Sequence, residues 1–396
     1  MNDNERRIRV AVLGAGGRGS GVTGNLLNDS SRHVEVAAVF DPDRDLCLRA
    51  LEAWQAPNAR VAESYEEAVA AEGVEWVLVF SPNAYHKEHI LCAFEHGKHV
   101  FSEKPLATTI EDCRAIHEAH RRSGLLFATG FVLRYAPLYR KVREILDSGS
   151  IGRLLSFDAN ENITPGHGGY IMANWRRDSR IAGPHILEKC CHDLDLLNWF
   201  TGSVPTSVAA FGGRDFFVSS NQFLMDRHGP ELFFAWGDPH RIDTPFHDEG
   251  GLMDNLVAVL QYRNGIRGQF QATMSNPIPE RRMYFSCTEG TLIAELYTGT
   301  LRVRGLGEDE ERSIELTGDG HGGGDAFIMK ELFDTMVNGT PPKCSGEEGL
   351  ESAVVALAID QAAREERIVD LEPVWQSLGR SPCSDNRHGG ARTDVP

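Results

Sequence analysis

Two short stretches of this sequence carry side chains that can move protons, and the first is centred on a lysine. Lys104 lies in the run Ser-Glu-Lys-Pro at residues 102–105, where the following proline disfavours a helical conformation and holds the lysine on an extended corner. A lysine beside a cationic ring can have a lowered pKa and exchange a proton. The same run also suits an ordinary surface loop, and both interpretations stay open on these residues alone.

The second stretch is Glu-Lys-Cys-Cys-His-Asp-Leu-Asp at residues 188–195. Apolar residues after it predict a buried helix, on which Glu188 and His192 would project from one face because they are four positions apart. A carboxylate can orient an imidazole that takes or gives a proton, so we interpret the pair as an acid–base unit. Lys189 and Asp193 share this spacing and predict a salt bridge.

A metal site in the same stretch is not expected. Adjacent residues of a helix point about 100° apart, and no second cysteine pair in the sequence completes a tetrahedron of ligands. We therefore interpret the two adjacent cysteines as buried packing residues.

A third group of residues suits the recognition of a sugar ring. The segment 160–177 is rich in glycine and asparagine and contains aromatic and cationic side chains. An aromatic ring with polar donors nearby can hold a sugar, and it can equally anchor the loop to which it belongs. A histidine before a later helix and an arginine after the sixth predicted strand are further candidates. The expected substrate contacts are Tyr170, Trp175, Arg176, His192, His321 and Arg134.

The elements that would position these side chains begin with a strand, a glycine turn and a helix. Apolar residues 8–13 precede the turn Gly14-Ala15-Gly16-Gly17-Arg18-Gly19, and a second apolar run ends at Asp41. In such a unit the glycines permit a tight turn, a close approach to a pyrophosphate and close packing of the helix, whose N-terminus faces the phosphates. Asp41 lies about 20 residues beyond the turn, where an acid binds the ribose hydroxyls. The unit predicts a dinucleotide site formed by Gly14, Ala15, Gly16, Gly17, Arg18 and Asp41.

The acid at the end of the second strand favours NAD over NADP. Asp41 would accept hydrogen bonds from the ribose diol and repel a 2′-phosphate. Arg44 is the competing feature, because a guanidinium could approach such a phosphate. Asp41 is ranked above it since Asp41 ends the strand itself, whereas Arg44 follows three residues later.

The alternation of strands and helices predicts two domains. Continuous apolar strands such as residues 74–80 are typical of a sheet that is buried on both faces. The pattern predicts a doubly wound parallel Rossmann sheet in residues 1–134. Longer strands with hairpin signals such as Asn264-Gly265 follow. They predict an open, mainly antiparallel sheet with helices on one face in residues 135–375, and the polar residues 376–396 predict a loose tail.

Composition excludes several classes of partner. A formal net charge of −17 argues against nucleic acid and against an anionic membrane surface. The sequence lacks a run of about 18 apolar residues that could span a bilayer, and its N-terminus lacks the apolar core of a signal peptide. Eight cysteines without a CxxC pair predict reduced thiols in the cytoplasm.

Two strands of the second half predict assembly. Residues 256–262 and 266–274 carry apolar side chains at both alternating positions, whereas the open face of a one-sided sheet in water should be polar. An apolar open face would meet a second subunit, so we expect a homodimer or a homotetramer built from such dimers. The alternative is a monomer whose open face is covered by loops such as residues 216–230.

Together these motifs resemble the Gfo/Idh/MocA family of oxidoreductases over residues 8–371. The resemblance is carried by the glycine turn, Ser81-Pro82-Asn83-Ala84-Tyr85-His86, Gly97-Lys98-His99-Val100, Glu103-Lys104-Pro105, Ile151-Gly152 and the element from Glu188 to His192. It implies NAD(P)-dependent hydride transfer at a carbinol carbon of a sugar or cyclitol, with Lys104 and His192 as the catalytic pair. It also implies cofactor contacts from Ser81, Asn83, His86, Glu103 and Lys104. Many family members have aspartate where this chain has Glu188, and the longer side chain would shift the geometry of a relay with His192.

The resemblance leaves three functions open. The first is a cytoplasmic NAD-dependent dehydrogenase acting on a secondary hydroxyl of a sugar, glycoside or cyclitol. The second is a glycosidase or lyase that retains NAD and oxidises its substrate transiently, and the third is a sugar-sensing regulator without turnover. Steady NADH production, bond cleavage without net NADH, and tight binding without turnover would distinguish the three.

Overall fold

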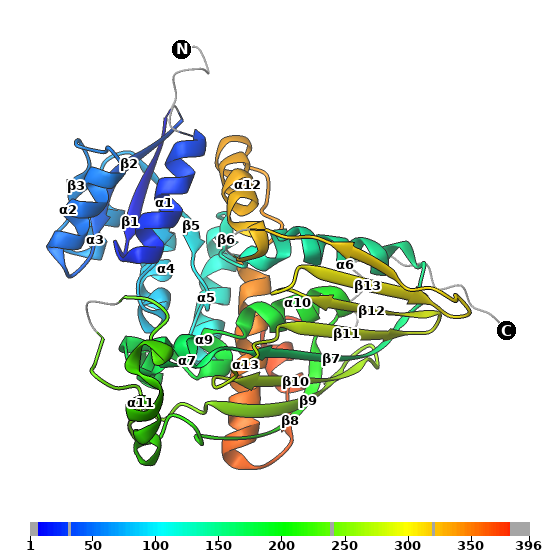
Figure 1. The fold of residues 1–396 in the computed structure, drawn as a ribbon. Helices are drawn as coiled ribbons and strands as arrows, with labels where there is room; N and C mark the ends of the chain where they lie inside the picture. The colour runs from blue at the N-terminus through cyan, green and yellow to red at the C-terminus, as the bar shows by residue number, and fades with distance from the viewer. Residues whose placement is uncertain (1–6, 31–32, 238–240, 319–320, 381–396) are drawn as a thin grey trace.

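The computed structural model describes residues 7–30, 33–237, 241–318 and 321–380, and it contains two sheets with flanking helices (Figure 1). The first sheet has six strands in the order β3-β2-β1-β4-β5-β6, and all of its pairs are parallel. Its strands are β1 (Ile8–Leu13), β2 (Val34–Phe40), β3 (Arg60–Val61), β4 (Val74–Val79), β5 (His99–Ser102) and β6 (Phe127–Thr129). The predicted Rossmann arrangement is confirmed.

Helices join these strands, as a parallel sheet requires. They are α1 (Gly17–Ser30), α2 (Arg44–Ala53), α3 (Tyr65–Val69), α4 (His86–Glu95) and α5 (Ile110–Ser123), with a short 3-10 turn, η1 (Asn83–Tyr85), before α4. The side chain of Thr109 caps α5 by accepting a hydrogen bond from the backbone N–H of Asp112. The glycine turn, Asp41, Ser81 and Lys104 all follow strands at their carboxyl ends. Ligands of open parallel sheets bind at this edge.

The second sheet has nine strands in the order β14-β13-β12-β11-β7-β10-β9-β8-β15. Only the central β7–β10 pair is parallel, so the predicted mainly antiparallel sheet is confirmed. The hairpin at Asn264-Gly265 joins β9 to β10, and Gly265 adopts a φ of 87°. The strands are β7 (Leu154–Asn162), β8 (Pro205–Gly213), β9 (Asn255–Tyr262), β10 (Arg267–Thr273), β11 (Arg282–Cys287), β12 (Gly290–Glu295), β13 (Thr300–Gly305), β14 (Arg312–Glu315) and β15 (Val369–Asp370).

Three helices cover one face of the second sheet (Figure 1). They are α6 (Pro137–Ser148), α10 (Cys191–Thr201) and α13 (Gly346–Glu365). The residues of β9 alternate between buried and exposed positions, because one side of the strand meets these helices and the other does not. Val257 and Val259 of β9 and Phe211 of β8 are exposed on the uncovered side.

Several short elements between β7 and β9 were not predicted. They are α7 (Pro165–Met172), η3 (Trp175–Arg177), α8 (Ser179–Ala182), α9 (His185–Glu188), η4 (Ser219–Asn221), α11 (Phe223–His228) and η5 (Pro230–Phe233). Part of this region packs around a small core of its own, which includes Ile171, Phe217, Phe233 and Phe246. The partly buried ring of Tyr170 packs against this core.

The last part of the chain returns to the parallel sheet. The helix α12 (Gly324–Asn338), preceded by η6 (His321–Gly323), packs against α1, and α13 packs against α5. The backbone carbonyl of Cys344 accepts a hydrogen bond from the N–H of Thr129 at 3.1 Å, so residues next to Cys344 cover the edge of β6. Residues at both ends of the chain therefore build the same layer.

The prediction of a loose tail from residue 376 is wrong for its first residues. The helix α14 (Glu372–Ser377) continues into this segment, Leu378 is buried, and Arg380 forms ion pairs with Glu347 and Glu351. Residues 381–396 lie outside the described residues.

The described parts of the chain contain no membrane-spanning helix, disulfide bond or cluster of metal ligands. None of the described helices is long and apolar enough to cross a membrane. The seven cysteines in these parts are free thiols. No group of three histidine, cysteine or acidic side chains there is placed to hold a metal ion.

Candidate active site

A cavity of about 950 Å³ lies at the carboxyl edge of the parallel sheet, between this edge and the aromatic segment of the second half. The cavity brings together Lys104 and His192, which lie far apart in the sequence. Of the residues predicted for a site, those that line it are Gly17, Arg18, Ser81, Asn83, His86, Glu103, Lys104, Tyr170, Trp175, Arg176, Glu188, His192 and His321. Gly14, Ala15, Gly16, Asp41 and Arg134 are not part of its lining.

The glycine turn has the geometry that a phosphate site needs. Gly14 has a φ of 99°, and a Cβ at Gly19 would lie 2.1 Å from the carbonyl oxygen of Gly14, so both positions require glycine. A Cβ at Gly16 or Gly17 would meet nothing within 4 Å, which leaves this side of the turn open. Because α1 begins at Gly17, its free N–H groups face the open side. These residues fit a dinucleotide pyrophosphate.

Asp41 lies directly beside this turn. Its carboxylate accepts hydrogen bonds from the backbone N–H groups of Ala15 at 2.8 Å and Asp43 at 2.9 Å. The competing cation Arg44 is exposed and forms an ion pair with Glu63 at 3.3 Å. The acid is therefore held at the end of β2, while the guanidinium is engaged with another carboxylate.

The stretch from Ser81 to His86 connects the loops at the carboxyl edge of the parallel sheet through hydrogen bonds. Both ring nitrogens of His86 contact backbone carbonyl oxygens, that of Pro105 at 2.7 Å and that of Ser81 at 2.8 Å. The amide of Asn83 donates to the carbonyl of Ala182 at 2.8 Å. These contacts tie the loops after β4 and β5 to α8, so they set the position of Lys104.

Lys104 is mostly shielded from solvent, with its side chain 16% exposed, and its environment favours the protonated form. Its Nζ donates to the backbone carbonyl of Glu188 at 2.7 Å and lies 4.0 Å from the Oε1 atom of the same residue. Burial alone would lower the pKa of Lys104, but the attraction of Glu188 and other nearby anionic groups outweighs it and raises the pKa. The lowered pKa expected beside a cationic ring is thus opposed by the protein's own groups.

His192 is in the opposite state. It is 2% exposed, and its Nδ1 has no hydrogen-bond partner among the described residues. Burial, followed by the positive charge of Lys104, lowers the pKa of His192 well below its usual value. A neutral imidazole therefore faces the same cavity as the Lys104 ammonium group.

The predicted pairing of Glu188 with His192 is wrong. The helix α9 ends at Glu188, and α10 begins only at Cys191, so the two residues do not share one helical face. The Glu188 carboxylate instead accepts a hydrogen bond from the Nε of Arg176 at 2.9 Å. Burial would raise the pKa of Glu188, but Lys104 and Arg176 outweigh it and lower the pKa to about 2. Glu188 is thus the fixed anion of Lys104 and Arg176.

The predicted salt bridge between Lys189 and Asp193 is wrong for the same reason. The Nζ of Lys189 lies 3.4 Å from a carboxylate oxygen of Glu161, and Asp193 accepts two hydrogen bonds from Arg281 at 2.8 and 2.7 Å. The guanidinium of Arg281 also lies 3.1 Å from Glu161. Lys189 and Arg281 line the cavity, and two buried acids hold them in its floor.

Four aromatic residues line one side of the cavity, and we call them the aromatic wall: Tyr170, Trp175, Trp236 and Tyr297. The guanidinium of Arg176 lies 4.4 Å from the ring centroid of Trp175 and donates to the hydroxyl of Tyr170 at 3.0 Å. Trp236 stands edge-on to Tyr170, with 5.1 Å between ring centroids. Trp236 and Tyr297 line the cavity but were missed from the sequence, in which no spacing connects them to Tyr170.

His321 lies at the end of a chain of charged contacts. Its Nδ1 is 2.8 Å from Oδ2 of Asp325, and Oδ1 of Asp325 accepts a hydrogen bond from Arg18 at 2.9 Å. The Nε of Arg18 donates in turn to Glu103 at 2.6 Å. The ring centroid of His321 is 5.8 Å from that of His192, so the chain links the glycine turn to His192.

The structure contradicts the substrate contact expected from Arg134. Its guanidinium makes two hydrogen bonds of 2.7 Å to the buried carboxylate of Asp195 and lies against the ring of Trp199. Arg134 lines a separate cavity of about 1200 Å³ between α6 and α12. It therefore joins η2 (Val132–Tyr135) to α10.

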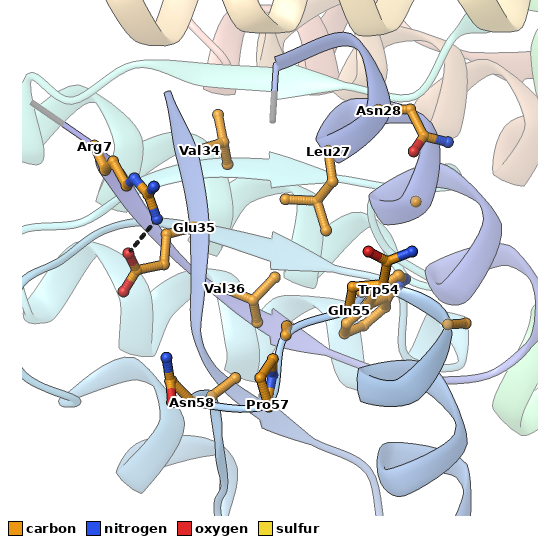
Figure 2. A pocket seen from close by; sticks show the side chains of 14 residues that line it. Arg7, Leu27, Asn28, Val34, Glu35, Val36, Trp54, Gln55, Pro57 and Asn58 are labelled. Carbon is orange, nitrogen blue, oxygen red and sulfur yellow. Dashed lines mark ion pairs between the residues drawn. The ribbon is translucent and has the colours of Figure 1, made fainter. Parts of the chain in front are cut away.

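Another cavity, of about 340 Å³, lies near the start of β2 (Figure 2). Side chains of Leu27, Val34, Val36 and Trp54 surround it, and an ion pair between Arg7 and Glu35 closes one side. The cavity contains none of the predicted site residues. Because β2 begins at Val34, this cavity lies at the amino edge of the sheet, away from Lys104.

Comparison with known proteins identifies the family. Residues 8–131 match a family described as oxidoreductases with an NAD-binding Rossmann fold, and residues 143–371 match the C-terminal α/β domain of the same family. The chain is 24% identical to scyllo-inositol 2-dehydrogenase (NAD(+)) of Bacillus subtilis (strain 168) over 307 residues, which are 75% of each chain. It is 26% identical over 305 residues to 2,7-anhydro-N-acetylneuraminate hydratase of Mediterraneibacter gnavus, covering 76% of this chain and 72% of that protein.

A solved structure supports the same fold. Levoglucosan dehydrogenase in complex with NADH and levoglucosan superposes with a TM-score of 0.77 at 18% identity, over 93% of this chain and all of that one. The two matched ranges together contain both sheets. They also contain every residue that lines the 950 Å³ cavity, including Leu296, Tyr297, His321 and Asp325. The chain therefore belongs to the Gfo/Idh/MocA family of oxidoreductases.

Proposed function

We propose that this protein transfers hydride between a secondary hydroxyl of a sugar or cyclitol and the nicotinamide of NAD. The observation that carries the proposal is one cavity, in which a protonated lysine and a neutral histidine meet beside an open glycine turn. The names of the similar proteins, which include a scyllo-inositol dehydrogenase and a levoglucosan dehydrogenase, support this substrate class.

The charge states of the two residues divide the chemistry between them. Bound NAD supplies a hydride acceptor. His192 is neutral and accepts the proton of the substrate hydroxyl as the carbonyl forms. Lys104 remains charged and donates a hydrogen bond to the same oxygen, which stabilises its developing negative charge. In the direction of reduction, protonated His192 gives the proton to the carbonyl oxygen, and Lys104 donates the same hydrogen bond to this oxygen.

Glu188 acts through Lys104 in this proposal. Its backbone carbonyl and its carboxylate hold the ammonium group, and its second partner, Arg176, connects Lys104 to the aromatic wall. Tyr170 and Trp175 present ring faces and edges that suit the C–H groups of a sugar ring. Residues 1–134 then form the cofactor domain, and residues 135–375 form the substrate and assembly domain.

The test is NADH production from a panel of scyllo-inositol, levoglucosan and D-glucose with NAD. Lys104→Ala and His192→Ala should each lower kcat by about 10²–10⁴-fold, because general acid–base groups contribute this much, while both keep the fold and most of the NAD affinity. Glu188→Gln should lower kcat less and shift its pH profile. Near-normal kcat in both alanine variants would contradict the assignment.

A second function rests on one of the relatives. The hydratase from Mediterraneibacter gnavus covers 76% of this chain, about as much as the scyllo-inositol dehydrogenase, which covers 75%. Its name describes the addition of water, which involves no net oxidation, and this fits the alternative in which NAD is retained and no net NADH forms. Cleavage or hydration of an anhydro-sugar without NADH accumulation would favour this alternative over the dehydrogenase.

A further inference from the structure

His192 has to release a proton in every oxidative turnover, and its surroundings oppose keeping it. The alcohol carbon gives its hydride to NAD and the hydroxyl gives its proton to His192, which leaves an imidazolium. This imidazolium would be buried next to the positive charges of Lys104, Lys189 and Arg281. A cation without an anionic partner in such a place is unstable, so the proton must leave before the next turnover.

The residues around His192 offer few acceptors for this proton. Lys104 is already protonated, and Glu188 is engaged with Lys104 and Arg176. Phe131 stands edge-on to the imidazole at 5.7 Å and is apolar. The carboxylate of Asp193, although adjacent in sequence, is bound by Arg281.

His321 differs from these neighbours in three respects. Its ring lies 5.8 Å from that of His192 between centroids, its side chain is 34% exposed, and its Nδ1 is held by Asp325 at 2.8 Å. A bridging water or a small rotation spans such a separation between rings. The carboxylate of Asp325 can stabilise a positive charge on His321, as acids do in histidine–carboxylate pairs.

Asp325 is fixed as an anion for this task. Burial would raise its pKa, but the hydrogen bond from His321 and the charge of Arg18 outweigh burial and lower the pKa to about 2. Arg18 is itself held by Glu103. Asp325 from α12 thus contacts His321 directly, Arg18 from α1 and Glu103 after β5 are linked to it through Asp325, and the neutral ring of His192 from α10 lies on its other side.

We propose that His321, oriented by Asp325, carries the proton of His192 to solvent. The inference rests on the proposed dehydrogenase function and adds a proton path to it. In oxidation the proton passes from substrate to His192, then to His321, then to water, and the hydride remains on the nicotinamide. His321 acts through His192, so it is a positioning and relay residue and not a substrate ligand.

The test is the time course of NADH formation by His321→Gln, with the panel sugar that the wild type oxidises fastest. His192 and Lys104 are both intact in this variant, and His192 is neutral at the start, so the first turnover should give a burst of about one NADH per site at the wild-type rate. Later turnovers should be about 10–100-fold slower, because the relay supplies part of the usual contribution of a proton-transfer group. Added imidazole should restore the steady rate in proportion to its concentration.

The matched control is His228→Gln, an exposed histidine of α11. It should behave as the wild type with and without imidazole. A raised KM in His321→Gln without a burst or a response to imidazole would show a substrate contact and overturn the relay. An unchanged steady rate would overturn it as well. Absence of NADH from the wild type with every sugar overturns the proposed function, and the relay with it.

Asp325→Asn provides a second variant in case His321→Gln does not fold. It keeps the imidazole but removes the anion that orients it. At saturating NAD it should give a full burst followed by a slow steady rate. A steady rate equal to that of the wild type would overturn the role of the pair.

Discussion

At the scale of single residues, burial acts against charge on both Lys104 and His192, and their partners decide the outcome. Lys104 keeps its proton because Glu188 supplies a carbonyl and a carboxylate. His192 is buried beside Lys104, and its Nδ1 has no hydrogen-bond partner among the described residues, so it stays neutral. The two opposite states follow from the position of one acid, which the broken helix places against Lys104 and Arg176.

We expect the choice between NAD and NADP to depend on one residue, Asp41, on the adenosine side of the cofactor site. Asp41 stays at the end of β2 through hydrogen bonds from two backbone N–H groups, and its carboxylate would repel a 2′-phosphate. We expect wild-type Kd for NAD to be at least about 10-fold lower than for NADP, which is about 1.4 kcal/mol. In Asp41→Asn this ratio should fall towards one, because the amide keeps an acceptor oxygen without the charge.

Isothermal titration with both cofactors measures this preference. Arg44→Gln is the control and should leave the ratio unchanged, since Arg44 is exposed and paired with Glu63. Equal affinity of the wild type for NAD and NADP would refute the role of Asp41.

At the scale of elements, the turn between β1 and α1 contains glycines that are needed for two different reasons, the fold itself and the binding of a ligand. Gly14 and Gly19 are needed for the fold, since a Cβ at either would collide with backbone atoms. Gly16 is not needed for the fold, because a Cβ there meets open space. If a pyrophosphate occupies this space, a methyl group at Gly16 must displace it.

Gly16→Ala should therefore fold normally and bind NAD more weakly, by about 10-fold or more. Gly21→Ala, in the middle of α1 with open space around its Cβ, is the matched control. It should bind NAD as the wild type does and gain up to about 1 kcal/mol of stability from helix propensity. Melting temperatures and NAD titrations of both variants decide the point, and unchanged NAD affinity in Gly16→Ala would count against the pyrophosphate site.

His185, at the start of the short helix α9, should make the free energy of unfolding depend on pH. Both ring nitrogens of this buried residue lack hydrogen-bond partners among the described residues, and burial lowers its pKa from 6.5 to about 4. Between these two pH values the unfolded chain binds a proton that the folded chain does not. The free energy of unfolding should therefore fall as pH falls from 6.5 to 4, by roughly 3 kcal/mol from this residue.

His185→Leu removes this titration and should flatten the loss of stability over that pH range. Urea unfolding measured at several pH values between 6.5 and 4 gives the slope. His228→Gln, which is exposed, should keep the slope of the wild type. An equal slope in His185→Leu would show that the buried imidazole does not contribute.

At the scale of the whole molecule, the open face of the second sheet is the part of the fold that another subunit could cover. Phe211 is 75% exposed and Val259 is 56% exposed, and both strands that carry them are covered by helices only on the opposite face. Exposed apolar residues gathered on one face mark interaction surfaces. The two-fold arrangement expected from the sequence remains a prediction.

Light scattering at micromolar concentration should show a dimer or tetramer and no stable species with the mass of one chain. Phe211→Glu combined with Val259→Glu should shift the protein to that single-chain mass, because like charges would meet across a two-fold axis. Leu48→Glu changes an exposed leucine of α2 and should leave the assembly intact. A wild-type protein that scatters as one chain would rule out the interface.

Local spacing in the sequence determined much of this fold. The alternation of strands and helices, the glycine turn, the hairpin at Asn264-Gly265 and the change to an antiparallel sheet follow from periodicity and turn chemistry. Both depend on residues within a few positions of each other. Lys104 and His192 could be selected from the sequence because they stand in recognisable motifs.

Only the tertiary structure decided which partners these residues take. The hydrophobic pattern predicts one helix through residues 188–192, whereas in the structure one helix ends at Glu188 and the next begins at Cys191. The carboxylate of Glu188 therefore lies against Lys104 and Arg176. Arg134 is predicted from the sequence to contact substrate, but in the structure its guanidinium donates two hydrogen bonds to the buried carboxylate of Asp195 on α10. Ion pairs, the aromatic wall and the link from His321 to His192 join residues far apart in the chain. Their choice depends on distances and burial that exist only after the two sheets have packed together.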